Sequence, residues 1–226
     1  METEITSAPA YAVARCTLSP GETVRAESGA MLAKSPNVEI ETSSQGGFMK
    51  GLRRSLGGES FYMNTFTAKD GPGEIRLAPT LPGDIVEWQL TGQTVFLASG
   101  AYLASGGDID VDSKWGGAKG MFSGAGLVLL KCTGTGPLLT ASYGAIESVD
   151  LAAGQTYTID TDHVVGWGSD VTYEVRKVGG WKSTMLSGEG LVVDVTGPGR
   201  VYLQTRSAQA FLGWLIPKLP RDNSRS

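Results

Sequence analysis

Histidine and cysteine are scarce in this chain of 226 residues, which has one histidine and two cysteines. His163 alone cannot form a zinc site of three histidines, and the sequence has no Gly-x-Ser-x-Gly elbow for a serine nucleophile. Cys16 and Cys132 are too few for a disulfide framework, so we expect two buried, reduced thiols. These shortages predict a protein that is not an enzyme and that holds no metal or cofactor.

Long hydrophobic runs and an excess of positive charge are also missing. Apolar runs such as 126–130 are far shorter than the roughly 18 to 20 residues of a membrane-spanning helix. The first residues are polar and acidic where a secretory signal is basic and then apolar, so we expect a cytoplasmic protein. A net charge of -4 and a pI near 5.1 argue against broad attraction to nucleic acid, although a local basic patch can exist within that average.

Glycine, by contrast, is abundant, and its 32 residues separate short runs in which apolar and polar residues alternate. Half-buried strands have this period of two. The alternation is clearest at Val86–Leu90 and Val171–Arg176. Further strands are predicted at 38–41, 61–66, 157–159, 191–195 and 201–205. The pattern predicts an all-β fold.

Three segments of the chain resemble one another, which indicates internal repeats. Their openings are Leu18-Ser-Pro-Gly21, Leu81-Pro-Gly83 and Leu151-Ala-Ala-Gly154. Each segment closes on a turn before a strand, and the three turns are Gly71-Pro-Gly73, Gly134-Thr-Gly136 and Gly197-Pro-Gly199. We therefore predict one domain over 1–226, a β-sandwich built from three similar β-units in a pseudo-threefold arrangement, with units at about 18–80, 81–150 and 151–206. Grooves are expected at the edges between units, and chance similarity among glycine-rich strands is the alternative.

Helical periodicity follows the repeats. Ala208, Phe211, Leu212 and Leu215 recur at i, i+3, i+4 and i+7, and prolines at 217 and 220 end the pattern, which predicts a short helix within 207–220. Trp214 lies outside that face and adds apolar surface. Phe211, Leu212, Trp214 and Leu215 are therefore candidates for an interaction helix. Its face can dock on the domain, contact another chain or make a peripheral membrane contact.

Four ordered motifs lie along the chain: GGFMKGLRRSLGGESFYMNTFT at 46–67, LPGD at 81–84, QTRS at 204–207 and FLGWLIPKLP at 211–220. Over about residues 18–220 the chain resembles the AIM24 family, a domain of unknown function. The resemblance implies a fold similar to the tryptophan RNA-binding attenuation protein, a β-sandwich that forms rings. A yeast member acts in mitochondria on inner-membrane organisation, but this chain lacks an Arg-rich leader and resembles a prokaryotic member. The resemblance implies no catalytic residues, and a shared fold is weak evidence for function.

A loop with three cations is the main candidate for a binding site. Lys50, Arg53 and Arg54 lie between pairs of glycines, and backbone N–H groups together with cations suit an anion or an acidic partner. The segment matches neither a phosphate-binding loop nor a dinucleotide fingerprint. We therefore keep two interpretations, an anion- or partner-binding loop and a structural loop between units.

Other polar segments are weaker candidates. Asp108, Asp110 and Asp112 fall on one face of a strand but miss the EF-hand pattern, so a solvated acidic face is expected. His163, beside Asp162, has no second histidine for a metal site and is expected to be a lone surface or core residue. The five tryptophans do not recur beside cations as stacking platforms for RNA do, so packing in the core or between units is expected.

These observations favour a non-enzymatic binding or scaffolding protein of the AIM24 type, whose partner is a protein, a membrane-associated complex or a further copy of the chain. Two alternatives stay open. A nucleic-acid-binding module predicts salt-dependent binding centred on Lys50, Arg53 and Arg54. An enzyme predicts a pocket that holds carboxylates with strongly shifted pKa values.

Overall fold

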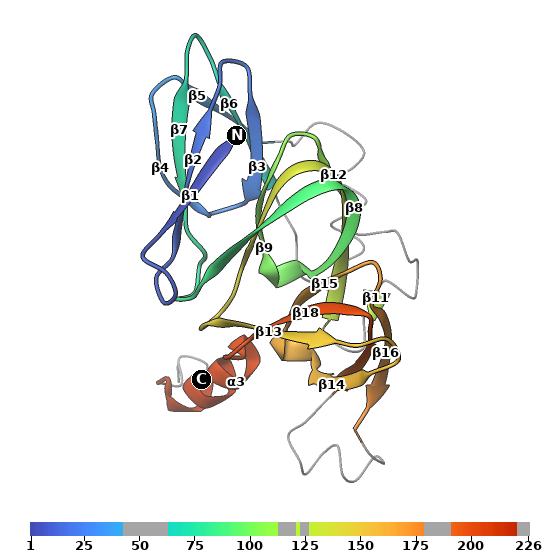
Figure 1. The fold of residues 1–226 in the computed structure, drawn as a ribbon. Helices are drawn as coiled ribbons and strands as arrows, with labels where there is room; N and C mark the ends of the chain where they lie inside the picture. The colour runs from blue at the N-terminus through green and yellow to red at the C-terminus, as the bar shows by residue number, and fades with distance from the viewer. Residues whose placement is uncertain (43–62, 113–120, 123–126, 179–190, 221–226) are drawn as a thin grey trace.

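The chain folds into antiparallel β-sheets followed by one short helix (Figure 1). This computed structural model describes residues 1–42, 63–112, 121–122, 127–178 and 191–220. The predicted all-β class with a C-terminal helix is confirmed. The helical elements are η1 (Ser99–Ala101), η3 (Thr161–His163), α3 (Ala208–Leu215) and η4 (Ile216–Lys218).

The strands form one large sheet and two small ones. The small sheets have the orders β1 (Glu2–Thr6), β2 (Val13–Leu18), β7 (Gly73–Leu77), β4 (Met31–Lys34) and β14 (Thr156–Asp160), β17 (Leu191–Thr196), β16 (Thr172–Lys177). The large sheet follows the order β13 (Ile146–Leu151), β18 (Gly199–Gln204), β15 (Val164–Gly168), β8 (Ile85–Ala98), β12 (Leu127–Ala141), β9 (Tyr102–Gly106), β3 (Thr23–Glu27), β6 (Met63–Ala68), β5 (Val38–Thr42). Two further strands, β10 (Ile109–Asp112) and β11 (Met121–Phe122), also pair with β12.

Two long strands, β8 and β12, cross the middle of the molecule and pair along most of their length. The turn predicted at Gly134-Thr-Gly136 is wrong, because β12 runs through it as a continuous strand with a register shift between Thr133 and Thr135. Gly134 and Gly136 have φ values of 136° and 125°, and Gly92 in β8 has a φ of 105° at the same step of the register. Glycine adopts these angles without a steric cost, so both strands bend together instead of ending.

The same pairing scheme occurs in three successive segments. In the first segment β7 pairs with β2 and β4, while β6 pairs with β3 and β5. In the third, β18 pairs with β13 and β15, while β17 pairs with β14 and β16. In the middle segment, β8 and β12 are each long enough to take the place of two strands of the scheme. They pair with each other in both halves, and β12 also pairs with β10 in its first half and with β9 in its second half.

A β-bulge also recurs at one step of this scheme. It lies between Met31 and Ala33 in β4, between Tyr102 and Ala104 in β9, and between Val164 and Gly166 in β15. These registers define equivalent positions in the three segments. The pseudo-threefold arrangement itself stays a prediction.

The hydrophobic core is divided among three clusters, each centred on one segment of the chain. Cys16 lies in the first cluster and Cys132 in the second, and both side chains are fully buried and free. Burial raises the pKa of each thiol to about 12, because a thiolate would lose its hydration. The prediction of two buried thiols is confirmed.

Candidate functional site

The cationic loop predicted as a binding site lies outside the described residues. Lys50, Arg53 and Arg54 belong to the segment 43–62, so their role stays a prediction. Trp115 and Trp181 also lie outside the described part of the chain. The described Trp167 is buried, and Trp88 lies with its ring centroid 4.4 Å from that of Tyr202, which confirms packing roles for these two rings.

The C-terminal helix forms where the sequence predicts it, but it is not buried along its apolar face. Ser207 caps the helix by accepting a hydrogen bond from the Ala210 N–H, and its hydroxyl donates to Asp162 Oδ2 at 3.0 Å. Phe211 contacts Tyr143, with 6.2 Å between ring centroids. Trp214 is 60% exposed. The helix is thus fastened at its first turn and leaves apolar surface open.

The predicted interaction residues therefore include side chains that another molecule can reach. Phe211, Leu212 and Trp214 are exposed, and Leu215 is half-buried. Lys218 Nζ lies 5.3 Å from the centroid of the Trp214 ring. Among the described residues no helix is long and apolar enough to cross a membrane.

The acidic strand and the histidine form no metal centre in the described structure. Asp110 in β10 is exposed between the buried side chains of Ile109 and Val111, as expected for a solvated acidic face. His163 Nδ1 lies 2.7 Å from the Gln204 carbonyl oxygen. No group of three His, Cys, Asp or Glu side chains in the described ranges is arranged to hold a metal ion.

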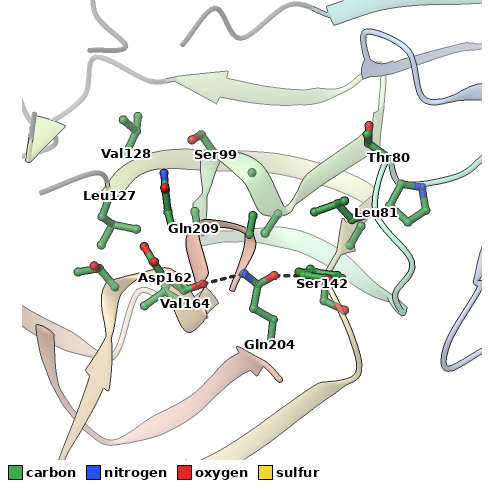
Figure 2. Close-up of a pocket in the computed structure, with 18 of the residues that line it drawn as sticks. Thr80, Leu81, Ser99, Leu127, Val128, Ser142, Asp162, Val164, Gln204 and Gln209 are labelled. Atoms are coloured by element: carbon green, nitrogen blue, oxygen red, sulfur yellow. Dashed lines mark hydrogen bonds between the residues drawn. The ribbon is translucent and has the colours of Figure 1, made fainter. Parts of the chain in front are cut away.

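A cavity of about 240 Å³ lies where the three segments meet (Figure 2). The end of β3, the helical turns η1 and η3, the segments 79–81 and 141–143, the start of β12 and the first turn of α3 all contribute to its wall. Figure 2 shows Gln204 reaching across this region: its amide N–H donates to the Asp162 carbonyl oxygen at 2.7 Å, and its amide oxygen accepts from the Tyr143 N–H at 2.9 Å. These bonds tie the third segment to the linker that precedes it.

The charged side chains of the described cavity wall are both acidic, Glu27 and Asp162. Burial raises the pKa of the Glu27 carboxyl to about 7, because desolvation penalises the charged form. Within the described residues, the Glu27 carboxylate has no hydrogen-bond or ion-pair partner. No local motif in the sequence marks Glu27 as a site residue.

Adjacent segments are joined by strand pairing at two places, which we call the inner junctions. At the first, β9 pairs with β3, with Ser105 opposite Arg25 at the centre. At the second, β15 pairs with β8, with Trp167 opposite Phe96 at the equivalent position. Each inner junction therefore uses the same two strand positions of the repeated pairing scheme.

The strand β4 holds the place of β9 and β15 in the first segment, but it is the outer strand of its sheet. Leu32 in β4 is 60% exposed, whereas the equivalent Leu103 and Val165 are fully buried at the inner junctions. Met31 is 41% exposed. The edge thus carries apolar side chains like those that are covered elsewhere in the molecule.

In the third segment, β14 holds the place that β3 has in the first segment and that the second half of β8 has in the middle one. It too is the outer strand of its sheet. Tyr157 in β14 is 43% exposed, whereas Val24 and Val95, its equivalents, are buried. Within the described residues, one half of an inner junction is therefore left open in the first segment and the other half in the third.

Comparison with known proteins agrees with the sequence motifs. A sequence model described as "Mitochondrial biogenesis AIM24" matches residues 3–206. An uncharacterized protein of Streptococcus pyogenes serotype M6 is 32% identical over 216 residues, which cover 92% of this chain and 86% of that protein. The crystal structure of a Streptococcus pyogenes protein has 29% sequence identity and a TM-score of 0.80, and the match covers 96% of this chain and 99% of that one. The chain therefore belongs to the AIM24 family.

Proposed function

We propose that this protein is a non-enzymatic scaffold that assembles head to tail with copies of itself, β14 of one copy pairing with β4 of the next. The observation that carries this proposal is the pair of complementary open edges. In the described part of the chain, each edge lacks the strand that its equivalents have at the inner junctions, and each exposes apolar side chains there. An open sheet edge with exposed apolar residues is a template for pairing with another strand.

The sheet orders support the same pairing. Across each inner junction, three strands of one segment continue into three strands of its neighbour, as in β13, β18, β15 followed by β8, β12 and β10. The two small sheets correspond to the two sides of such a junction, but they are separate from each other. One ends at β4 and the other at β14. Joining them would complete a third junction of the same kind.

The partner in this junction is a second molecule. Figure 1 shows β4 and β14 far apart, on opposite sides of the same molecule. The contact would be heterologous, because β4 meets β14 rather than another β4, and heterologous contacts build rings when they close and filaments when they do not. Such an assembly would display α3 and the loops of every copy, which gives a scaffold many identical sites for a partner.

Two single substitutions test the proposal. Leu32→Asp and Tyr157→Asp each place a charge in the junction, so we expect the assembled wild-type protein, a multiple of 23.7 kDa, to fall to a mass of 23.7 kDa in both variants. Size-exclusion chromatography with light scattering measures this mass over a range of protein concentrations.

Two further variants serve as controls. Ile40→Asp changes a residue of similar exposure, 42%, on the β5 edge, which has no part in the junction, so its mass should equal that of the wild type. Phe211→Asp tests assembly through the helix and should also leave the mass unchanged. A monomeric wild-type protein, or an assembly that survives Leu32→Asp and Tyr157→Asp, would contradict the proposal.

A further inference from the structure

The cavity between the three segments has the features of a ligand site that the proposed assembly does not use. Its wall combines apolar side chains, such as Leu81, Leu127 and Val164, with about as many polar ones. Cavities at the boundaries between structural units are frequent small-molecule sites. Its volume of about 240 Å³ is below the roughly 300 to 1,000 Å³ of most ligand pockets, so the ligand must be small.

We propose that this cavity binds a small organic cation, a protonated primary amine with a short aliphatic chain, with the carboxylates of Glu27 and Asp162 as its counter-charges. No Lys, Arg or His side chain belongs to the described wall, so these two acidic groups set the charge of the cavity. A carboxylate withdrawn from water is stabilised by an opposite charge and by donated hydrogen bonds. An ammonium group supplies both, since it has three N–H donors.

Hydrogen-bond accounting favours a donor as the ligand. The Glu27 carboxylate accepts no hydrogen bond from any described residue. Asp162 Oδ2 accepts one from the Ser207 hydroxyl, while the Gln204 amide is already occupied on both of its atoms. The Ser142 hydroxyl donates to the Gly144 carbonyl oxygen at 2.6 Å and already accepts from the Asp84 N–H at 3.2 Å. The two carboxylates of the wall, which can only accept when charged, therefore have capacity left for a donor such as an ammonium group.

Amine binding should be linked to the loss of a proton from Glu27. With its pKa raised to about 7, the Glu27 carboxyl is largely neutral at pH 6 and largely charged at pH 8. The other titratable groups that face it from the described elements are the buried phenol of Tyr102 in β9 and, across the cavity, Tyr143 and Asp162. An alkylammonium ion keeps its charge over this range, because an aliphatic amine such as Lys loses its proton only near pH 10. The affinity should therefore fall by about tenfold from pH 8 to pH 6, as the charged form of Glu27 becomes scarce.

The experiment compares n-butylammonium with 1-butanol, a neutral molecule of the same length. Isothermal titration calorimetry on the full chain at pH 8 should show millimolar or tighter binding of n-butylammonium and none of 1-butanol. Glu27→Gln removes one counter-charge, so its dissociation constant should rise by at least about tenfold and lose the dependence on pH. Glu87→Gln is the control, because Glu87 is an exposed carboxylate of β8 that does not line the cavity.

Each outcome decides the proposal. No binding of n-butylammonium at pH 8, equal binding of the alcohol, or a wild-type affinity in Glu27→Gln would overturn it, provided that thermal unfolding shows the variant to be folded. The assembly proposal is tested separately, since neither β4 nor β14 contributes to the cavity wall.

Discussion

Replacement of Trp167 by alanine is expected to lower the free energy of unfolding by about 3 to 5 kcal/mol, the cost of truncating a large aromatic side chain in a core. The Trp167 side chain is fully buried, and its ring centroid lies 5.3 Å from that of Tyr173. The residue also lies opposite Phe96 at the centre of the second inner junction. The substitution thus empties space where two segments meet. Urea unfolding at a fixed protein concentration measures the change.

Two other tryptophan variants calibrate this result. Trp214→Ala, at a residue that is 60% exposed, should change the free energy of unfolding by less than about 0.5 kcal/mol. Trp167→Phe should cost less than Trp167→Ala, because phenylalanine keeps most of the buried aromatic side chain, while both remove the Trp167 Nε1 donor, which has no hydrogen-bond partner within the described residues. A Trp167→Ala protein as stable as Trp214→Ala would contradict the placement of this ring in the core.

Gly166→Ala is expected to destabilise the protein by about 2 to 3 kcal/mol, although it adds a single methyl group. A Cβ atom at Gly166 would lie 2.5 Å from the Phe96 carbonyl oxygen and 2.6 Å from Leu97 Cδ2. The nearer obstacle is main chain held in a β-sheet, so β15 would have to move away from β8 at the second inner junction. The measurement is again the free energy of unfolding in urea.

Gly168 provides the matched control on the same strand. A Cβ atom at Gly168 meets no atom within 4 Å, so Gly168→Ala should leave the stability within about 0.5 kcal/mol of the wild type. Equal losses of stability in the two variants would mean that contact with β8 is not the cause of the loss at Gly166. A loss confined to Gly166→Ala is the expected result.

Much of the fold could be predicted because strand alternation and turn glycines are local signals. The segments Leu191–Val195 and Val171–Arg176 match β17 and β16 to within a residue or two. The strand β1 is not predicted, because its short polar sequence carries no clear strand signal. The bend in β12 was mistaken for a turn, since glycines with positive φ serve both purposes and only the pairing with β8 separates them.

The functional surfaces depend on contacts that no local pattern encodes. Glu27 and Asp162 are far apart in the sequence and share a cavity only because the end of β3 and the turn η3 both line it. The alternation of β14 predicts a strand but not that its outer side is left unpaired. The C-terminal helix is the opposite case: its periodicity predicted the element, while the exposure of Trp214 depends on its docking through the first turn alone.

The most direct test of head-to-tail assembly is a disulfide cross-link between two different single-cysteine variants. Thr158 in β14 is equivalent to Arg25 and Phe96, and Lys34 in β4 is equivalent to Ser105 and Trp167, so the third junction would place Thr158 opposite Lys34 of the next copy. Residues opposite each other in antiparallel strands have Cα atoms about 4.5 to 5.5 Å apart, within the range that a disulfide spans. The native Cys16 and Cys132 are fully buried, so the background should be low.

Lys34→Cys and Thr158→Cys are purified separately, mixed under mild oxidation and examined by non-reducing electrophoresis and mass spectrometry. The account predicts a covalent dimer that contains one chain of each variant and that forms only in the mixture. Cross-linking of either variant with itself would contradict pairing of β14 with β4. So would the absence of a cross-link in a mixture whose chains light scattering shows to be assembled.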